Sequence, residues 1–305
     1  MRASALNSPR ILEIKKKKRK VKRRKLFLII FLLALFLAGL CYLSRWQKIN
    51  ISEIKISGNK VIETATIESI VKNDLSGYYL KVIPKTNFLL YPGGRIKSDL
   101  ARTFKRLGNI NLSVKDFRTL EVDVSERTAL YTWCGDTFFN PENGDSFPSP
   151  EAGGSNTEEK CYFMDENGYV FDKAPYFSGE VYLKFYGYTS SHNEDPLGSY
   201  YFKPDFGKLV SFRDTLAKAG LKISSFYVKD NGDIGVFLSS SSPGTIGPEI
   251  IFKSDADFEK IAENLQTVLA TDPIQSDFKN KYSSLLYIDL RFGDKVYYKF
   301  KGNGK

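Results

Sequence analysis

Positions 26–43 hold eighteen residues without a charge, directly after a strongly basic segment, and this feature constrains the fold more than any other. A helix of that length covers roughly 27 Å, close to the thickness of a bilayer's hydrocarbon core. A charged side chain at its centre would cost about 2.5–3.5 kcal/mol, and the stretch contains none. Arg45, Trp46 and Lys48 follow, and such basic and aromatic residues are typical of a headgroup layer. The pattern predicts a transmembrane helix over residues 26–44.

Two other interpretations of this stretch are weaker. A fully buried core helix would place the neighbouring segment at 15–25, in which ten of eleven residues are Lys or Arg, against a protein core. A cleaved signal peptide has an apolar region of about 7–15 residues and small residues before its cleavage site. Here the apolar run is longer, and Leu40 and Tyr42 stand where small residues are expected. We therefore expect an uncleaved membrane anchor.

The chain carries a net charge of +10, and the residues before the apolar stretch account for it. Residues 1–25 contain twelve Lys or Arg against one Glu, so residues 26–305 together sum to −1. The positive-inside rule predicts that the basic tail at 1–25 stays in the cytoplasm and that residues 45–305 lie outside. The basic run could also contact anionic lipid or nucleic acid. Because the outer part lacks the basic surplus of a nucleic-acid footprint, we expect no nucleic-acid partner.

Three cysteines are present, Cys41 in the apolar stretch and Cys134 and Cys161 beyond it. With 26 residues between them, Cys134 and Cys161 could form a disulfide that stabilises the fold by roughly 3 kcal/mol in the chain-entropy model. Two free thiols are the alternative, and an extracytoplasmic location favours the disulfide. A metal site is not expected, because no His or third Cys lies near either residue.

Residues 45–128 show the pattern of a small β-α-α-β-β domain. Alternating apolar residues predict strands, Gly58-Asn59 predicts a turn, and apolar residues three or four apart predict two amphipathic helices. Thr64 is the expected N-cap of the first helix, and Gly108 is the expected stop after the second. The predicted elements are a strand at 49–57, helices at 63–74 and 95–108, and strands at 110–117 and 119–127.

Residues 129–300 predict a larger, mixed but mainly antiparallel β domain with two helices, and residues 301–305 form a short tail. Turn-forming and acidic residues dominate positions 135–160, which predicts a mobile insertion held at its base by Cys134 and Cys161. The helices are expected at 204–220 and 254–270, and the strands at 162–164, 169–171, 180–187, 222–229, 233–239, 249–253, 284–292 and 295–300. The expected fold class is α+β, with two modules behind a single membrane helix.

Short motifs in both regions are shared with a known family. In the first region the matching residues are Ile56, Gly58, Asn59, Ile67, Leu80, Val82, Leu120, Val122, Val124, Glu126, Arg127 and Trp133. In the second, Asp165 and Gly168 match an Asp-x-x-Gly motif, and residues 287–292 match a Tyr-x-Asp-Leu-Arg-Tyr strand. With these motifs the chain resembles the bacterial cell-division family FtsQ/DivIB, which joins a polypeptide-transport-associated (POTRA) domain to a β domain. It departs from the family at Asp116-Phe117-Arg118, where the hairpin usually carries a proline.

The resemblance implies a non-enzymatic scaffold of the divisome, with one span of the cytoplasmic membrane, its N-terminus in the cytoplasm and its bulk outside, at the division septum. It implies recruitment through the POTRA-like domain and binding of the bitopic division proteins FtsB and FtsL beside the strand at 287–292. An edge strand offers unpaired N–H and C=O groups to which a partner strand can add. The positions carried over as partner-binding are Tyr287, Asp289, Arg291 and Phe292, with Tyr297 and Tyr298 as neighbours on the pairing strand. Ordinary packing of these side chains within the sheet is the alternative.

The sequence gives no sign of a catalytic, cofactor or metal site. The single histidine, His192, lies in a polar loop without the apolar pattern of a pocket, so a solvated side chain is expected. Asp230 and Asp233 fit hairpin-turn chemistry, and Asp255 and Asp257 fit the first turn of a helix, where carboxylates favour the dipole. Two other functions stay open. One is an anchored envelope enzyme or ligand sensor, and the other is a POTRA protein of protein transport, although only one such unit is predicted.

Overall fold

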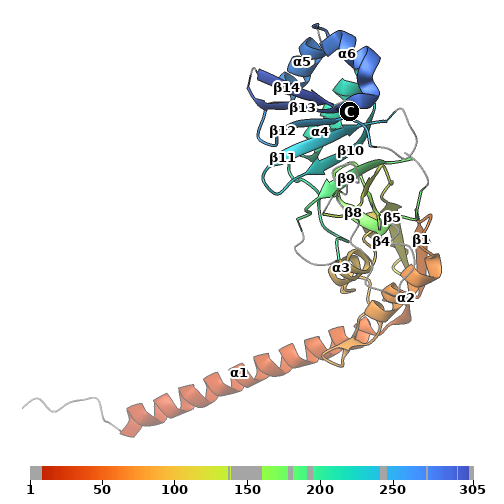
Figure 1. Cartoon of the computed structure of the whole chain (residues 1–305). Coiled ribbons are helices and arrows are strands. Elements are labelled where there is room, and N and C mark those ends of the chain that lie inside the picture. Colours follow the sequence, from red (N-terminus) through yellow and green to blue (C-terminus); the bar gives the residue numbers. More distant parts are fainter. Residues whose placement is uncertain are drawn as a thin grey trace, which may run out of the picture. The chain divides into compact units, whose positions relative to one another are not determined.

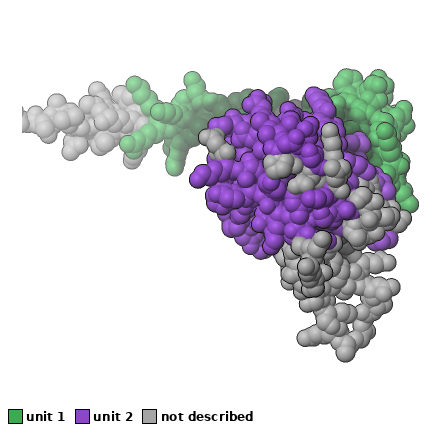
Figure 2. Space-filling model, turned by 45° about the horizontal axis from the view of Figure 1, so that its top comes forward, with its two compact units in different colours: residues 1–126 green, residues 127–305 purple. Residues whose placement is uncertain are grey.

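The computed structural model describes residues 9–136, 138, 160–177, 181–190, 195–240, 246–272, 274–293 and 295–301. The chain divides into two compact units, residues 1–126 (unit 1) and residues 127–305 (unit 2) (Figure 2). His192 and most of the insertion predicted at 135–160 lie outside the described residues.

Unit 1 begins with one long helix, α1 (Pro9–Ser44) (Figure 1). Strong helix formers fill it, Gly39 is its only glycine, and its only proline stands at the first position, where a missing N–H is harmless. The part Lys18–Ser44 is long and apolar enough to cross a membrane, by length and composition. None of its most apolar window is buried inside the described part of the protein, which is unlike a core helix.

A three-stranded sheet follows, in the order β1-β5-β4. Its strands are β1 (Glu53–Ser57), β4 (Leu107–Lys115) and β5 (Thr119–Glu126). The central strand β5 is antiparallel to β4 and parallel to β1. Leu120, Val122 and Val124 of β5 are buried on one face, as the alternation in the sequence predicts.

Two helices, α2 (Thr64–Leu75) and α3 (Gly93–Thr103), close the core of unit 1. Their residues Ile67, Val71 and Leu100 have no exposed surface and pack in one cluster with the buried row of β5. The short strands β2 (Tyr78–Tyr79) and β3 (Ile83–Pro84) form a hairpin between the helices, and a single 3-10 turn, η2 (Gln47–Ile49), follows α1. The larger elements of this unit thus follow the order β-α-α-β-β.

Two predicted boundaries in unit 1 are wrong. The first strand begins at Glu53 rather than at 49, because the η2 turn comes first and Asn50 forms only an isolated bridge. The second helix ends at Thr103, and Gly108, the expected helix stop, lies inside β4. Leu107 is buried as a strand residue. Its spacing from the preceding apolar residues fits a helix equally well, so the pattern alone did not separate the two structures.

The turn before α2 is held by a carboxylate from β5 rather than by a local cap. Glu63, not Thr64, is the N-cap residue, and its side chain makes no capping hydrogen bond. The Glu126 carboxylate instead accepts hydrogen bonds from the backbone N–H groups of residues 60–62, at 2.7, 2.9 and 3.0 Å. Gly58 precedes this turn with φ +87°, and a Cβ there would lie 1.9 Å from the carbonyl oxygen of Val124. Only glycine allows so close an approach of the backbone to β5.

Unit 2 contains a nine-stranded sheet in the order β14-β13-β12-β11-β10-β9-β6-β7-β8. Its strands are β6 (Tyr131–Trp133), β7 (Tyr162–Met164), β8 (Val170–Lys173), β9 (Leu183–Gly187), β10 (Ile223–Val228), β11 (Asp233–Leu238), β12 (Glu249–Lys253), β13 (Leu285–Phe292) and β14 (Lys295–Phe300). Five of the strand pairs are antiparallel and three are parallel. The sheet is therefore mixed and mainly antiparallel, as predicted.

The helices α4 (Phe206–Lys218), α5 (Phe258–Leu269) and α6 (Ile274–Lys281) belong to this unit, with a 3-10 turn η4 (Tyr282–Ser284) before β13. The prediction of two helices is wrong for the described part of the unit, which contains three. Apart from Ile274 and Phe278, the residues of α6 are polar. Two apolar residues are too few for a periodic signal.

The two faces of the β11–β13 region differ in character. Val236, Ile250 and Ile288 lie opposite one another in register and share one buried cluster with residues of α4 and α5. The alternate positions point to the other face, because successive side chains of a strand point in opposite directions. That face carries ionised side chains, among them Asp233 at the start of β11 and Asp289 within β13.

Candidate functional site

The strand β14 stands at one end of the nine-stranded order, and β13 is its only neighbour among the described strands (Figure 1). Its residues alternate between exposed and half-buried. Lys295, Tyr297 and Lys299 are exposed, whereas Tyr298 and Phe300 pack against the core cluster. A strand in this position presents one row of backbone N–H and C=O groups to its surroundings.

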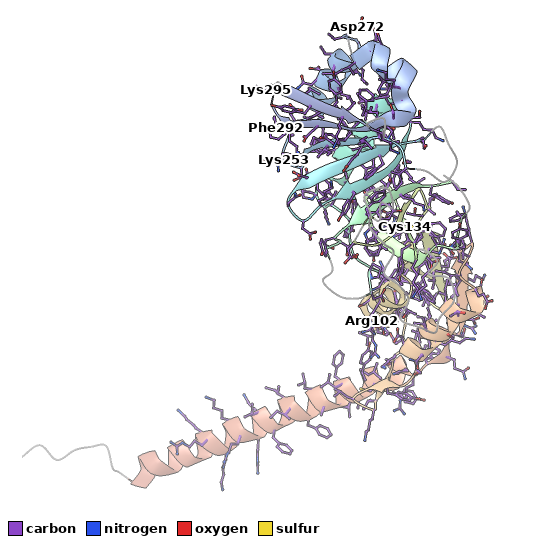
Figure 3. All side chains as sticks on the ribbon, in the orientation of Figure 1. Arg102, Cys134, Lys253, Asp272, Phe292 and Lys295 are labelled. Atoms are coloured by element: carbon purple, nitrogen blue, oxygen red, sulfur yellow. A yellow bond between two sulfur atoms is a disulfide. The ribbon has the colours of Figure 1, made fainter. Side chains whose placement is uncertain are left out.

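The most exposed aromatic side chains of this edge are Phe292 and Tyr297, which are 55% and 51% exposed. Their rings contact edge-on with centroids 5.3 Å apart. Phe292 and Lys295 lie at the same end of the β13–β14 hairpin, near Lys253 at the end of β12 (Figure 3). Interface cores are enriched in such large aromatic residues.

The six residues carried over as partner-binding differ in accessibility. Tyr287 lies opposite Lys299 in the β13–β14 register and is half-buried. Tyr298 lies opposite Ile288 and packs against the core cluster, so its ring contributes to the fold. Phe292 and Tyr297 are exposed, as described above, whereas Asp289 and Arg291 belong to an ion network.

Arg291, near the end of β13, lies between two carboxylates. Its Nη2 and Nε donate to Asp289 at 2.6 and 2.8 Å, and its Nη1 donates to Asp233 on β11 at 2.6 Å. Lys253 Nζ lies 2.5 Å from the other carboxylate oxygen of Asp233. Two cations therefore balance two carboxylates, and Asp233 and Asp289 are only 2% and 6% exposed. The network fixes β11, β12 and β13 to one another beside the exposed aromatic pair.

The network also determines the ionisation of its carboxylates. Burial alone would raise the pKa of Asp233, but the hydrogen bonds and charges of Lys253 and Arg291 outweigh it and hold the pKa below its ordinary value. The same opposition acts on Asp289, where burial raises the pKa and hydrogen bonds from the Arg291 side chain and backbone lower it overall. Both groups are therefore ionised at neutral pH.

Cys134 and Cys161 are joined in a disulfide across 27 positions of sequence. Cys134 directly follows β6, and its N–H donates to the carbonyl oxygen of Phe185 on β9 at 2.9 Å. The neighbouring Trp133 Nε1 donates to the Gly187 carbonyl at 2.8 Å. The covalent link thus lies where hydrogen bonds already hold the strands together.

Two of the acidic residues singled out in the sequence have structural roles. Asp257 is the N-cap of α5 and accepts from the N–H groups of Glu259 and Lys260, and Asp233 belongs to the ion network. Among the described residues, no group of three or more His, Cys, Asp or Glu side chains could hold a metal ion. An open depression of about 270 Å³ lies at the start of α5, and charged residues such as Lys253 and Lys260 line it.

Sequence reasoning missed the parts of the ion network that lie far apart in the chain. Asp289 and Arg291 are two residues apart on one strand, and this spacing places them on the same face. Asp233 was interpreted as a turn residue and Lys253 was not singled out, because only the strand register brings them together.

The described structure combines an exposed apolar helix, α1, with two α+β units. The large sheet of the second unit ends in an edge strand, β14. These features define the class of protein. No protein-family model matches the chain, and no curated protein matches it. The resemblance to the FtsQ/DivIB family therefore depends on the motifs quoted above.

Proposed function

We propose that this chain is a non-enzymatic divisome scaffold of the FtsQ/DivIB type. In this proposal α1 crosses the cytoplasmic membrane with the basic tail inside, and the two units lie outside the membrane at the septum. The units bind other single-span division proteins of the FtsB and FtsL type. The observation that supports this proposal best is β14, which stands at the end of the large sheet with an exposed aromatic pair beside it.

Binding would proceed by addition of a partner strand to β14. The backbone of an edge strand supplies hydrogen bonds for any extended segment, so these bonds give affinity without sequence preference. Selectivity would then come from side chains beside the edge. Tyr297 and Phe292 offer apolar contact area, and Lys295 and Lys299 favour a partner segment with acidic residues.

In this proposal Asp289 and Arg291 act indirectly. Their charged groups bond to each other and to Asp233, so they position the end of β13 rather than offer free charges to a partner. Loss of Arg291 would leave two buried carboxylates with less compensation and would displace the strand that carries Phe292.

The test is co-purification of the full-length chain with FtsB- and FtsL-type partners. We expect Phe292→Glu and Tyr297→Glu each to weaken binding by about tenfold or more, because central aromatic residues often contribute at least 2 kcal/mol at interfaces. Tyr176→Glu is the matched control, since Tyr176 is an exposed tyrosine that follows β8 at the opposite end of the strand order. Partner binding that is unchanged in both edge variants would overturn the assignment of β14.

Localisation tests the cellular part of the proposal. A fluorescent fusion of the full chain should form a band at midcell in dividing cells. A uniform membrane signal in dividing cells would count against a divisome role even if the chain is anchored in the membrane.

A further inference from the structure

The segment between α2 and α3 is fastened to the end of α1 by hydrogen bonds. Arg45 Nε donates to the Val82 carbonyl at 3.2 Å, and Asn87 Nδ2 donates to the Ser44 carbonyl at 3.4 Å. Asn50 links the end of α1 to this segment, since its Nδ2 donates to the Ser44 carbonyl at 3.0 Å and its Oδ1 accepts from the Thr86 hydroxyl at 2.9 Å. The segment therefore lies directly beside the residue at which α1 ends.

Backbone pairing strengthens this attachment. The N–H of Ile51 donates to the Thr86 carbonyl at 2.7 Å, and the N–H of Phe88 donates to the Ile49 carbonyl at 3.2 Å. Asn50 and Asn87 form an antiparallel bridge between these bonds. Because main-chain and side-chain contacts agree, the segment has a defined position relative to the end of α1.

Large apolar side chains on this segment point into solvent. Leu80 is 93% exposed, Leu89 is 74% exposed, and Tyr78 is 59% exposed. Phe117 in the β4–β5 turn is 58% exposed, and its ring lies 4.8 Å from that of Phe88, next to Leu89. We call Tyr78, Leu80, Leu89 and Phe117 the hairpin face.

Two members of the hairpin face stand in a backbone conformation that disfavours them. Leu80 has φ +48° at the tip of the β2–β3 hairpin, and Phe117 has φ +57° at the tip of β4–β5. The left-handed region is usually occupied by Gly, Asn or Asp in such turns, and it costs other residues about 1–2 kcal/mol. Neither side chain gains core packing there, since both are exposed.

The charge around the hairpin face is mainly positive, although the exposed Asp116 lies beside Phe117 in the β4–β5 turn. Residues 76–92 contain Lys81 and Lys85 and no acidic residue. At the end of α1, Arg45 and Lys48 add two more cations, and the exposed Trp46 lies between them in sequence. Aromatic residues and cations next to an apolar helix are the composition of a bilayer interface.

We propose that the hairpin face docks on the lipid headgroup layer of the leaflet from which α1 emerges. This inference rests on the proposed membrane span of α1. Leu80 and Phe117 would enter the boundary between headgroups and acyl chains, where their exposed area is removed from water. The lysines would meet the phosphates of anionic lipids. Unit 1 would then be held at the membrane surface by this face as well as by its covalent link to α1.

The test uses the full chain in vesicles of phosphatidylethanolamine and phosphatidylglycerol. Three variants are made in a Cys41→Ala background, namely Leu80→Cys, Leu33→Cys and Val61→Cys. Each carries one environment-sensitive fluorophore on the introduced cysteine. Lipids with a spin label near the headgroup or along the acyl chain report lipid contact by quenching. Leu33 lies in the proposed span, and the exposed Val61 lies beside Glu126, at the end of β5 far from the Phe117 turn. Thermal unfolding verifies that each labelled variant is folded.

We expect headgroup-labelled lipid to quench the fluorophore at position 80 and to leave the one at position 61 unaffected. A second variant, Leu80→Asp, carries its fluorophore at position 89. We expect this substitution to lower the fraction of molecules whose fluorophore contacts lipid by about tenfold or more, because the variant lacks one leucine that would be buried in the membrane. Val61→Asp, with its fluorophore also at position 89, should leave this fraction unchanged.

The outcomes separate this inference from the proposed function. Quenching at position 33 without quenching at position 80 would overturn the docking while the span stands. No lipid quenching at position 33 would overturn the span itself and the docking with it. A fluorophore at position 80 that is shielded from a water-soluble quencher but not reached by lipid would show that protein covers the hairpin face, and this result too would overturn the docking.

Discussion

At the scale of single residues, Glu126 shows how one side chain joins distant parts of unit 1. It ends β5, and its carboxylate accepts hydrogen bonds from three successive backbone N–H groups before α2. Burial by itself would raise its pKa, but these backbone hydrogen bonds hold the pKa below the ordinary value. The carboxylate thus fixes the turn that leads into α2, whose N-cap residue Glu63 makes no side-chain capping bond.

Replacing Glu126 with Gln should destabilise unit 1 by about 1–2 kcal/mol at neutral pH, because the charged acceptor is lost. A lowered pKa in the folded state means that the stabilisation is present above the ordinary value of 4.5 and disappears as the pH falls through the lower folded value. The difference between the two proteins should therefore shrink on acidification. Chemical unfolding at neutral and acidic pH measures it.

Glu68→Gln is the control for this prediction, since Glu68 forms an exposed i,i+4 pair with Lys72 on α2. Such surface pairs contribute about 0.3–0.5 kcal/mol. If both variants lose the same small amount at every pH, Glu126 has no special role in holding the turn.

Residues matched by the resemblance acquire physical roles in the structure. Asp165 accepts from the N–H groups of Asn167 and Tyr169 in the β7–β8 turn and forms a buried ion pair with Arg127. Gly168 closes the same turn with φ +72°. The strands predicted at 162–164 and 169–171 imply this turn, but the pairing with Arg127 spans 38 positions and leaves no local signal.

At the scale of elements, the longer hairpins and four of the helices were predicted, whereas the short strands β2, β3 and β6 and the helix α6 were not. The β4–β5 and β10–β11 hairpins and β13–β14 lie close to their expected ranges, because alternation and turn residues specify both strands of a hairpin. The helix α5 begins at Phe258 rather than at 254, where Asp257 caps it. The exposure of Phe292 and Tyr297 could not be predicted, since it depends on which strand ends the sheet.

The helix α1 gives a prediction at this scale. Leu33→Lys places a charge near the middle of the apolar stretch and should reduce insertion, because a central lysine costs about 2.5–3.5 kcal/mol. Leu26→Lys is the matched control, since it adds the same charge at the edge of the basic run, where the side chain can reach the interface. The fraction of full chain retained in membranes after alkaline extraction measures the difference. Equal retention of both variants would mean that residues 26–43 do not form the span.

At the scale of the whole molecule, each of the two units has its own hydrophobic core, and the disulfide belongs to unit 2. The sequence alone did not decide whether Cys134 and Cys161 form a disulfide or remain two free thiols, because two cysteines carry little information about pairing. The structure resolves this choice by placing Cys134 beside β9 and next to Cys161.

Removing the disulfide by Cys134→Ser with Cys161→Ser should destabilise unit 2 by roughly 3 kcal/mol, the chain-entropy value for a loop of this length. Unfolding monitored by probes placed in each unit separates their responses. Cys41→Ala, which removes the free cysteine of α1, should leave unit 2 unchanged. If the double substitution changes the unfolding free energy of unit 1 alone, this result would contradict the role given to the disulfide.

If partners bind at β14 as proposed, the position of this strand would also determine the stoichiometry of the complex. A sheet edge accepts one strand, and that strand then becomes the new edge. If division proteins bind there, only one partner strand can pair directly with β14, and two partners that each offer a strand must compete for it or bind in sequence. Their relative concentrations, rather than their separate affinities alone, would then decide which complex forms first.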